Sequence, residues 1–298
     1  MSAVFSPRKP IPREVKRLAR KLTDNCVSEL EACRGKNPDD AVHAVRKSLK
    51  RLRALLRLVR TEVDPSIDRR EDERFRDISR RLNEARDDRI ALETLRELAC
   101  HAGDEHSARM FLHALDRLES RLAAKPDRAQ QLESIVSESI RSITRARKHI
   151  RKWSHVPDRW RTFARGLKDT YRRGAETLAL AAVDSSAENL HQWRKHVRYL
   201  SYQLAFLRRL GGKQIRTLSK AANELNQLLG AGHDLAILKR ALVEMVLPQL
   251  DAAESQELLM LVEHRRSELA RKAFGLGNRF FQDRPRDWGR QLKAVPNA

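Results

Sequence analysis

The residues with the clearest capacity for chemistry lie in the segment AVHAVRKSLKRLRALLRLVR, which spans residues 41–60. Basic side chains recur there every three or four residues, at His43, Arg46, Lys50, Arg53, Arg57 and Arg60. On a helix this spacing places them in one stripe along a single face. No acidic residue occurs between Asp40 and Glu62. A stripe of one sign is typical of a surface that binds an anion carrying many charges.

A second stripe, of apolar residues, lies beside the basic one. Each member precedes a basic residue by one position, at Val42, Val45, Leu49, Leu52, Leu56 and Val59. One residue corresponds to about 100° around a helix. We therefore predict an amphipathic helix whose apolar row packs into the core and whose basic row flanks that core. The alternative is a lattice of salt bridges, in which acids on adjacent helices pair with the basic row.

The composition favours an anionic partner over complete internal pairing. The chain has 298 residues, with 61 Lys and Arg against 40 Asp and Glu, a net charge of +21. Arg contributes 45 of the 61, and guanidinium groups suit phosphate oxygens. Acids cannot pair with every basic side chain, so the surplus points to nucleic acid, polyphosphate or an anionic membrane surface.

The fold class predicted from the sequence is all-α. Apolar residues recur at three- and four-residue intervals almost throughout, and breaks between these segments predict roughly nine helices. We find no apolar run of about 18–20 residues that would span a membrane. The first residues lack the apolar run of a signal peptide, and the three cysteines lack disulfide or metal spacing. We therefore expect a cytoplasmic protein without a membrane span.

The chain also repeats itself at an offset of 148 residues. VHAVRKSLKRL (42–52) aligns with LHQWRKHVRYL (190–200). This alignment superposes His43 on His191, Arg46 on Arg194 and Lys47 on Lys195, and Arg198 continues the second basic row. At the same offset in the preceding segments, Arg13, Arg17 and Arg20 fall on Arg161, Arg165 and Lys168.

A third correspondence lies further along the chain. EARDDRIAL (84–92) aligns near GAGHDLAIL (230–238), with Asp87 close to the position of Asp234. Three matches in the same order indicate a duplication. We predict two pseudo-symmetric four-helix bundles, residues 1–156 and 157–298. The motif helices and the basic rows of the preceding segments would line a basic central groove or pore.

At these motifs the sequence resembles the CHAD family, histidine-marked α-helical domains that bind inorganic polyphosphate. The resemblance rests on HAVRKSLKRLR (43–53), YRRGAETL (171–178), LHQWRKHVRYLSY (190–202) and LLGAGHDLAIL (228–238). It implies two bundles around a basic surface, polyphosphate binding and association with polyphosphate granules. Ser201 stands where the family usually has a basic residue, and the first half lacks the Leu229–Gly230 pair.

The candidate polyphosphate-binding residues combine the resemblance with the stripes. They are His43, Arg46, Lys47, Lys50, Arg53, Arg57, His191, Arg194, Lys195, Arg198, Arg13, Arg17, Arg20, Arg161, Arg165 and Lys168. We predict no metal, no cofactor and no catalytic activity, since His43 and His191 lie in basic rows that repel a divalent cation. The sequence predicts no particular oligomeric state.

The alternative partner is RNA or single-stranded nucleic acid. Trp193, Tyr199 and Tyr202 could stack on bases, although Trp193 lies in an apolar row and is predicted to pack in the core. For Asp87 and Asp234 we favour an orienting role, in which each carboxylate pairs with a basic or helix-end group, over a catalytic one.

Overall fold

The structure is a computed structural model that describes residues 4–7, 9–32, 38–82, 87–124, 129–153 and 156–293. Its first six α-helices are α1 (Ile11–Ala32), α2 (Pro38–Val59), α3 (Pro65–Arg81), α4 (Asp87–Cys100), α5 (Glu105–Ala123) and α6 (Ala129–His149). The other five are α7 (Trp160–Val183), α8 (Ala187–Leu207), α9 (Gly212–Met245), α10 (Ala252–Phe280) and α11 (Pro285–Lys293). Three short 3₁₀ helices are η1 (Arg60–Glu62), η2 (Ile150–Lys152) and η3 (Leu247–Gln249). These residues form no β-strand, which confirms the all-α prediction.

Side-chain caps explain where several helices begin. Asp64 accepts a hydrogen bond from the backbone N–H of Ser66 at 2.7 Å, at the start of α3. Asp104 does the same for Ser107 at 2.8 Å, at the start of α5. These oxygens satisfy N–H groups that have no partner within the first turn of a helix. Both caps lie at breaks between apolar segments, residues 64–66 and 103–104, that the sequence predicts.

Two further breaks, which were not predicted, raise the helix count from roughly nine to eleven among the described residues. One separates α3, which ends at Arg81, from α4, which begins at Asp87. The intervening residues contain no Gly or Pro, so the sequence carries no strong signal there. The other separates α10 from α11, where Pro285 opens the new helix; that proline was a usable signal.

The described chain divides into two compact units, and each unit draws on both halves of the sequence. Unit 1 comprises residues 1–82, 133–226 and 274–298, whereas unit 2 comprises residues 83–132 and 227–273. Helices α9 and α10 each contribute one part to each unit. Compactness in space does not test common descent, so the two repeats divided at 156/157 stay a prediction.

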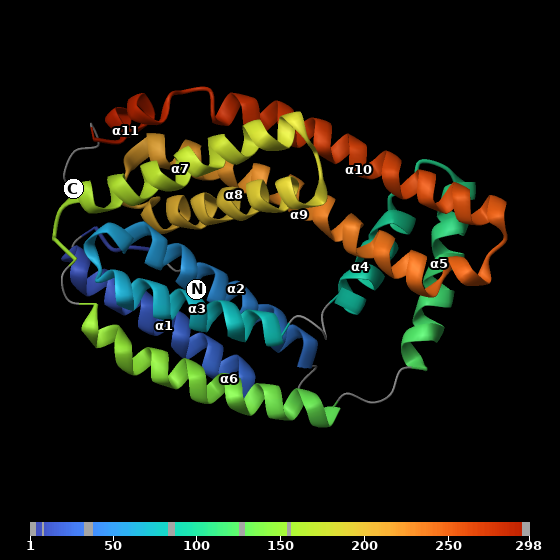
Figure 1. Cartoon of the computed structure of the whole chain (residues 1–298), viewed down its shortest axis with the longest axis horizontal. Coiled ribbons are helices and arrows are strands. Elements are labelled where there is room, and N and C mark those ends of the chain that lie inside the picture. Colours follow the sequence, from blue (N-terminus) through green and yellow to red (C-terminus); the bar gives the residue numbers. More distant parts are fainter. Residues whose placement is uncertain are drawn as a thin grey trace. The chain divides into compact units, whose positions relative to one another are not determined.

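Unit 1 is built on two helix pairs, α1 with α2 and α7 with α8, and α2 also packs against α7 and α8 (Figure 1). The apolar row of α2 is buried throughout, with Val45, Leu49, Leu52 and Leu56 fully inaccessible. Trp193 of α8 is also fully buried, and its ring stacks on Phe274 with centroids 5.1 Å apart. The predicted core positions of both motif helices are therefore confirmed.

Unit 2 packs α4 and α5 with the adjoining parts of α9 and α10. Its core is aliphatic apart from one ring, and includes Leu95, Phe111, Leu118, Leu242 and Val262. Because these side chains recur on one face of each helix segment, the four segments bury a continuous apolar surface.

A close backbone approach in unit 1 occurs at Gly166, where α7 crosses α2. A β-carbon at Gly166 would lie 2.1 Å from the carbonyl oxygen of Leu58. The crossing therefore requires a residue without a side chain, because a backbone atom cannot move aside as a flexible side chain can.

Gly166→Ala should lower the free energy of unfolding by about 1–3 kcal/mol or more, through overpacking at this crossing. Gly275→Ala in α10 is the matched control, since no atom lies within 4 Å of the place that its β-carbon would take. Replacing a helical glycine in open space should raise stability by about 0.5–1 kcal/mol. Urea denaturation of both variants measures the difference, and equal effects would contradict the close approach.

Candidate functional site

The two helices that carry the repeated motif, α2 and α8, pack against each other. The guanidinium of Arg51 lies 5.6 Å from the ring centre of Tyr202, and that of Arg57 lies 4.3 Å from the ring centre of Tyr199. A later residue of α2 thus meets an earlier residue of α8, so the two helices run antiparallel. The structure therefore brings together the two helices that carry the repeated motif.

Asp72 of α3 bridges two members of the basic stripe. Its carboxylate accepts hydrogen bonds from Arg53 at 2.8 Å and from Arg57 at 2.5 Å. Burial alone would raise the pKa of Asp72, but the hydrogen bonds from Arg53 and Arg57 outweigh it and hold that pKa well below its usual range. Asp72 is therefore ionised at neutral pH and fixes both guanidinium groups in place.

Lys195 and His196 of α8 add further basic groups to this cluster. Burial lowers the pKa of Lys195, and the charges of Arg57 and Arg53 lower it further. The Lys195 ammonium donates to the Gln192 side chain at 3.0 Å. Burial also lowers the pKa of His196 to about 4, and neighbouring charges led by Lys195 add to the effect.

These residues, Arg53, Arg57, Asp72, Lys195 and His196, form what we call the bridge cluster. At neutral pH it carries three positive charges and one negative charge, because His196 is neutral. Burial, followed by the charges of Arg57 and Arg53, lowers the pKa of Lys195 within this cluster. An arrangement of this kind can stabilise an added anion, since the anion relieves repulsion among groups that are only partly solvated.

The salt-bridge alternative holds for the last part of the α2 stripe. In addition to the Asp72 bridge, Arg60 pairs with Asp68 at 3.1 Å. Asp68 and Asp72 are one turn apart on α3, which is the spacing that presents two acids to one neighbouring helix. Asp72 was not among the predicted site residues, and that spacing was a usable signal for it.

Arg46 has a different environment from the rest of the stripe. It is 9% exposed, and its guanidinium donates to the carbonyl oxygen of Ser79 at 2.8 Å, in the last turns of α3. A cation at the C-terminal end of a helix is favourable because the last carbonyl groups lack helical partners. Arg46 therefore ties α2 to α3, and its role as a phosphate ligand stays a prediction.

The remaining motif residues lie toward the surface. His43, Lys47 and His191 are exposed, whereas Lys50, Arg194 and Arg198 are half-buried. Partial burial of the imidazole, followed by the charges of Arg194 and Arg198, lowers the pKa of His191 below its ordinary value.

The predicted row on α1 extends toward the end of α6. Arg13 and Arg20 are exposed, and Arg17 pairs with Glu14 at 2.7 Å. Arg20 also lines a hollow of about 330 Å³ together with Arg147, Lys148 and Arg151. The α1 row therefore continues onto a second basic surface that the sequence motifs do not predict.

The corresponding row on α7 has one member in an ion pair with η1. Arg165 pairs with Glu62 at 3.0 Å, while Arg161 and Lys168 are exposed. Whether the rows of α1 and α7 share one groove with the motif helices stays a prediction.

The aromatic and acidic candidate residues have structural roles. Tyr199 is 1% exposed beneath Arg57, so its ring has no open face for a base. Asp87 pairs with Arg240 at 2.7 Å within unit 2, as the orienting role predicts. Across the described ranges, no group of three or more His, Cys, Asp or Glu side chains is arranged to hold a metal. Within the same ranges, no helix is long and apolar enough to cross a membrane.

The fold is all-helical, and its paired helices present partly buried positive charge. These two features define the class of this protein as a basic helical domain. The family is given by its sequence: a model of the CHAD domain matches residues 16–243, more than half of the chain. The chain belongs to the CHAD family, as the motifs predicted.

Two solved structures share the fold. The crystal structure of the CHAD domain from the plant Ricinus communis has 18% sequence identity and a TM-score of 0.52, covering 100% of this chain and 95% of that chain. PptA from Streptomyces chartreusis has 17% identity and a TM-score of 0.55, covering 92% of this chain and 100% of that chain. No curated protein matches the chain.

Asp72→Asn should destabilise the protein by about 1–3 kcal/mol, because it removes the carboxylate that two partly buried guanidinium groups share. The same change should strengthen binding of an anionic polymer, since both guanidinium groups become available. Chemical denaturation and a binding titration with long-chain polyphosphate measure the two effects.

The control is Glu105→Gln, which breaks an exposed pair with Arg109 in α5. Exposed pairs one turn apart contribute only about 0.3–0.5 kcal/mol. If Asp72→Asn weakened polymer binding, the bridge cluster would not be the site of attraction.

Proposed function

We propose that this protein is a non-enzymatic module that binds inorganic polyphosphate through the bridge cluster and the basic rows around it. The single observation that supports this most strongly is that two arginines, Arg53 and Arg57, share the one carboxylate of Asp72 close to the ammonium group of Lys195. A phosphate chain alongside α2 and α8 would supply the missing negative charge.

The chemistry of the side chains fits a phosphate polymer. Guanidinium groups donate two parallel hydrogen bonds to phosphate oxygens and keep their charge when partly buried. Arg53 and Arg57 share the single carboxylate of Asp72, so positive charge remains at the cluster for a phosphate chain to meet. Antiparallel packing of the two motif helices is compatible with a two-fold relation between the repeats whose axis runs perpendicular to both helices.

Base recognition is less well supported than phosphate recognition. Trp193 and Tyr199 are buried, and Tyr202 lies beneath Arg51. Proteins that bind single strands usually offer aromatic faces to successive bases. We therefore favour a ligand made of phosphate alone. Stronger binding of RNA in the competition test would instead indicate a nucleic-acid ligand.

Membership of the CHAD family supports the same ligand class, because polyphosphate binding is what the resemblance implies. We propose that the protein acts in the cytoplasm and associates there with polyphosphate granules. A basic face of this kind would hold the granule surface by charge, without a membrane anchor or a cofactor.

The double variant Lys47→Gln, Lys195→Gln removes the two lysines that the repeat makes equivalent. It should weaken long-chain polyphosphate binding at least tenfold. The slope of log affinity against log salt concentration should become shallower by about one to two. The thermal midpoint should stay constant or rise, because the charge on Lys195 is disfavoured in the free protein. Binding titrations and thermal unfolding measure these quantities.

The matched control is Lys213→Gln, Lys220→Gln, which removes two exposed lysines of α9. It changes the net charge equally but lies outside the motif helices. Equal losses of affinity in the two variants would show that the total charge, and not the bridge cluster, governs binding.

Salt should weaken polyphosphate binding steeply. If about eight phosphates are neutralised, affinity should fall roughly a thousandfold between about 50 and 200 mM salt, because bound counterions are released. In competition, long-chain polyphosphate should displace labelled RNA at far lower phosphate concentration than the reverse. A flat salt response, or stronger binding of RNA, would refute the proposed ligand.

A further inference from the structure

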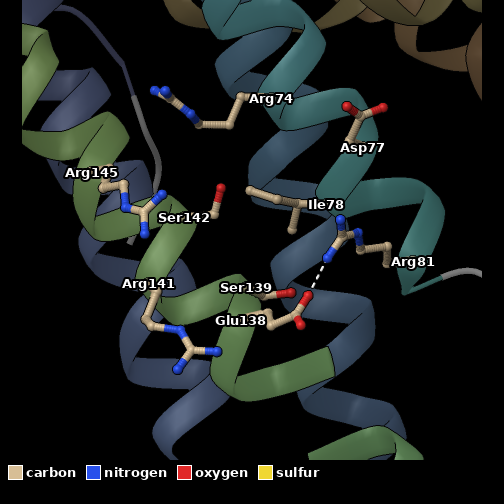
Figure 2. Close-up of a pocket in the computed structure, with 9 residues that line it drawn as sticks. All are labelled: Arg74, Asp77, Ile78, Arg81, Glu138, Ser139, Arg141, Ser142 and Arg145. Carbon is tan, nitrogen blue, oxygen red and sulfur yellow. Dashed lines mark hydrogen bonds and ion pairs between the residues drawn. The ribbon is translucent and has the colours of Figure 1, made fainter. Parts of the chain in front are cut away.

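A pocket between α3 and α6 lies outside the set of residues that forms the bridge cluster. Its volume is about 680 Å³, within the range of roughly 300–1,000 Å³ typical of small-molecule sites. It is lined by Arg74, Asp77, Ile78, Arg81, Glu138, Ser139, Arg141, Ser142 and Arg145 (Figure 2). All of these residues belong to unit 1.

Polar side-chain contacts bridge the two helices at both ends of this pocket. At one end Arg81 pairs with Glu138 (Figure 2). At the other, the ring of His149 lies 3.1 Å from the Glu71 carboxylate and 3.3 Å from the Arg74 guanidinium. The bridges are separated by about ten residues on α3, or about 15 Å. A small molecule fits within the space between the two bridges.

The side chains that line the pocket carry a net charge of +2, from four arginines against Asp77 and Glu138. Arg81 and Arg74 already have acidic partners, Glu138 and Glu71. Arg141 and Arg145, one turn apart on α6, pair with no carboxylate among the described residues. Two adjacent guanidinium groups suit the oxygens of one phosphate group, and a phosphate dianion matches the net charge.

The pocket also contains a buried hydroxyl without a partner. Ser139 is 2% exposed, and its Oγ forms no hydrogen bond with any described residue. Such a group is costly in a folded protein and calls for an explanation. Ser142 lies three residues further along α6, so both serines line the same side of the pocket (Figure 2). Hydroxyl groups of a ligand could bond to both.

We propose that this pocket binds a phosphate monoester of a small polar molecule. The phosphate lies between Arg141 and Arg145, and the hydroxyls of the organic part bond to Ser139, Ser142 and Asp77. The pocket is much larger than a phosphate ion, which leaves room for that organic part. This site is independent of polyphosphate binding and gives the protein a second, smaller ligand.

Calorimetric titration of the full chain with ribose 5-phosphate tests the proposal, with inorganic phosphate and ribose as comparison ligands. Ribose 5-phosphate should bind with one-to-one stoichiometry and at least fivefold more tightly than inorganic phosphate. The variant Arg141→Gln, Arg145→Gln should weaken the binding of ribose 5-phosphate at least tenfold. The matched control Arg121→Gln, Arg216→Gln, in exposed positions of α5 and α9, should change it less than twofold. Equal binding of the two phosphates, or no binding at millimolar concentration, would overturn the proposal.

Ser139→Ala separates a ligand-binding role from a structural one. It should weaken the binding of ribose 5-phosphate three- to tenfold, because one hydrogen bond to the ligand is lost. The thermal midpoint without ligand should stay constant or rise, because the variant removes a buried hydroxyl that has no partner. A lower midpoint with unchanged affinity would overturn the proposal.

The polyphosphate variant shows whether the two sites are independent. Lys47→Gln, Lys195→Gln should keep its affinity for ribose 5-phosphate, even if polyphosphate binding is lost or was never present. Loss of both ligands in that variant would assign them to one surface and refute the second site.

Discussion

The bridge between Asp72 and two arginines is the interaction on which the surface around α2 depends. The basic row of α2 lies about 100° from its apolar row, so packing the apolar row draws the basic side chains to the edge of the core. There they lose part of their hydration while facing charges of the same sign. One carboxylate is shared by Arg53 and Arg57, and this allows the two groups to lie close together. The cluster stays positive, because one carboxylate cannot balance two guanidinium groups and the ammonium of Lys195.

The sequence predicted the parts of the fold that depend on helical periodicity. The apolar row of α2 and the buried place of Trp193 follow from spacing alone, because residues on one face of a helix must share an environment. Helix starts at Asp64 and Asp104 follow from local cap chemistry. The direct packing of α2 against α8 was not predicted, because a shared motif does not specify which helices meet.

The partners of individual charges were not predictable in the same way. Asp72 meets Arg53 and Arg57 because α3 packs at one particular register against α2, and a single sequence does not specify that register. The same limit applies to Arg46, which has the spacing of a surface residue but lies against a carbonyl of α3. A basic stripe therefore predicts where positive charge gathers, but not which members remain available to a ligand.

Arginine and lysine have different roles in the cluster for a physical reason. The guanidinium of Arg57 is planar and has a flat face; it donates to Asp72 while its central carbon lies over the ring of Tyr199, so one group makes two kinds of contact at once. An ammonium group has no such face, and its pKa responds readily to burial. Arg53 and Arg57 therefore supply fixed charge, whereas the charge on Lys195 depends on its surroundings. An anion at the cluster would raise the pKa of Lys195, so binding and protonation of this side chain would reinforce each other.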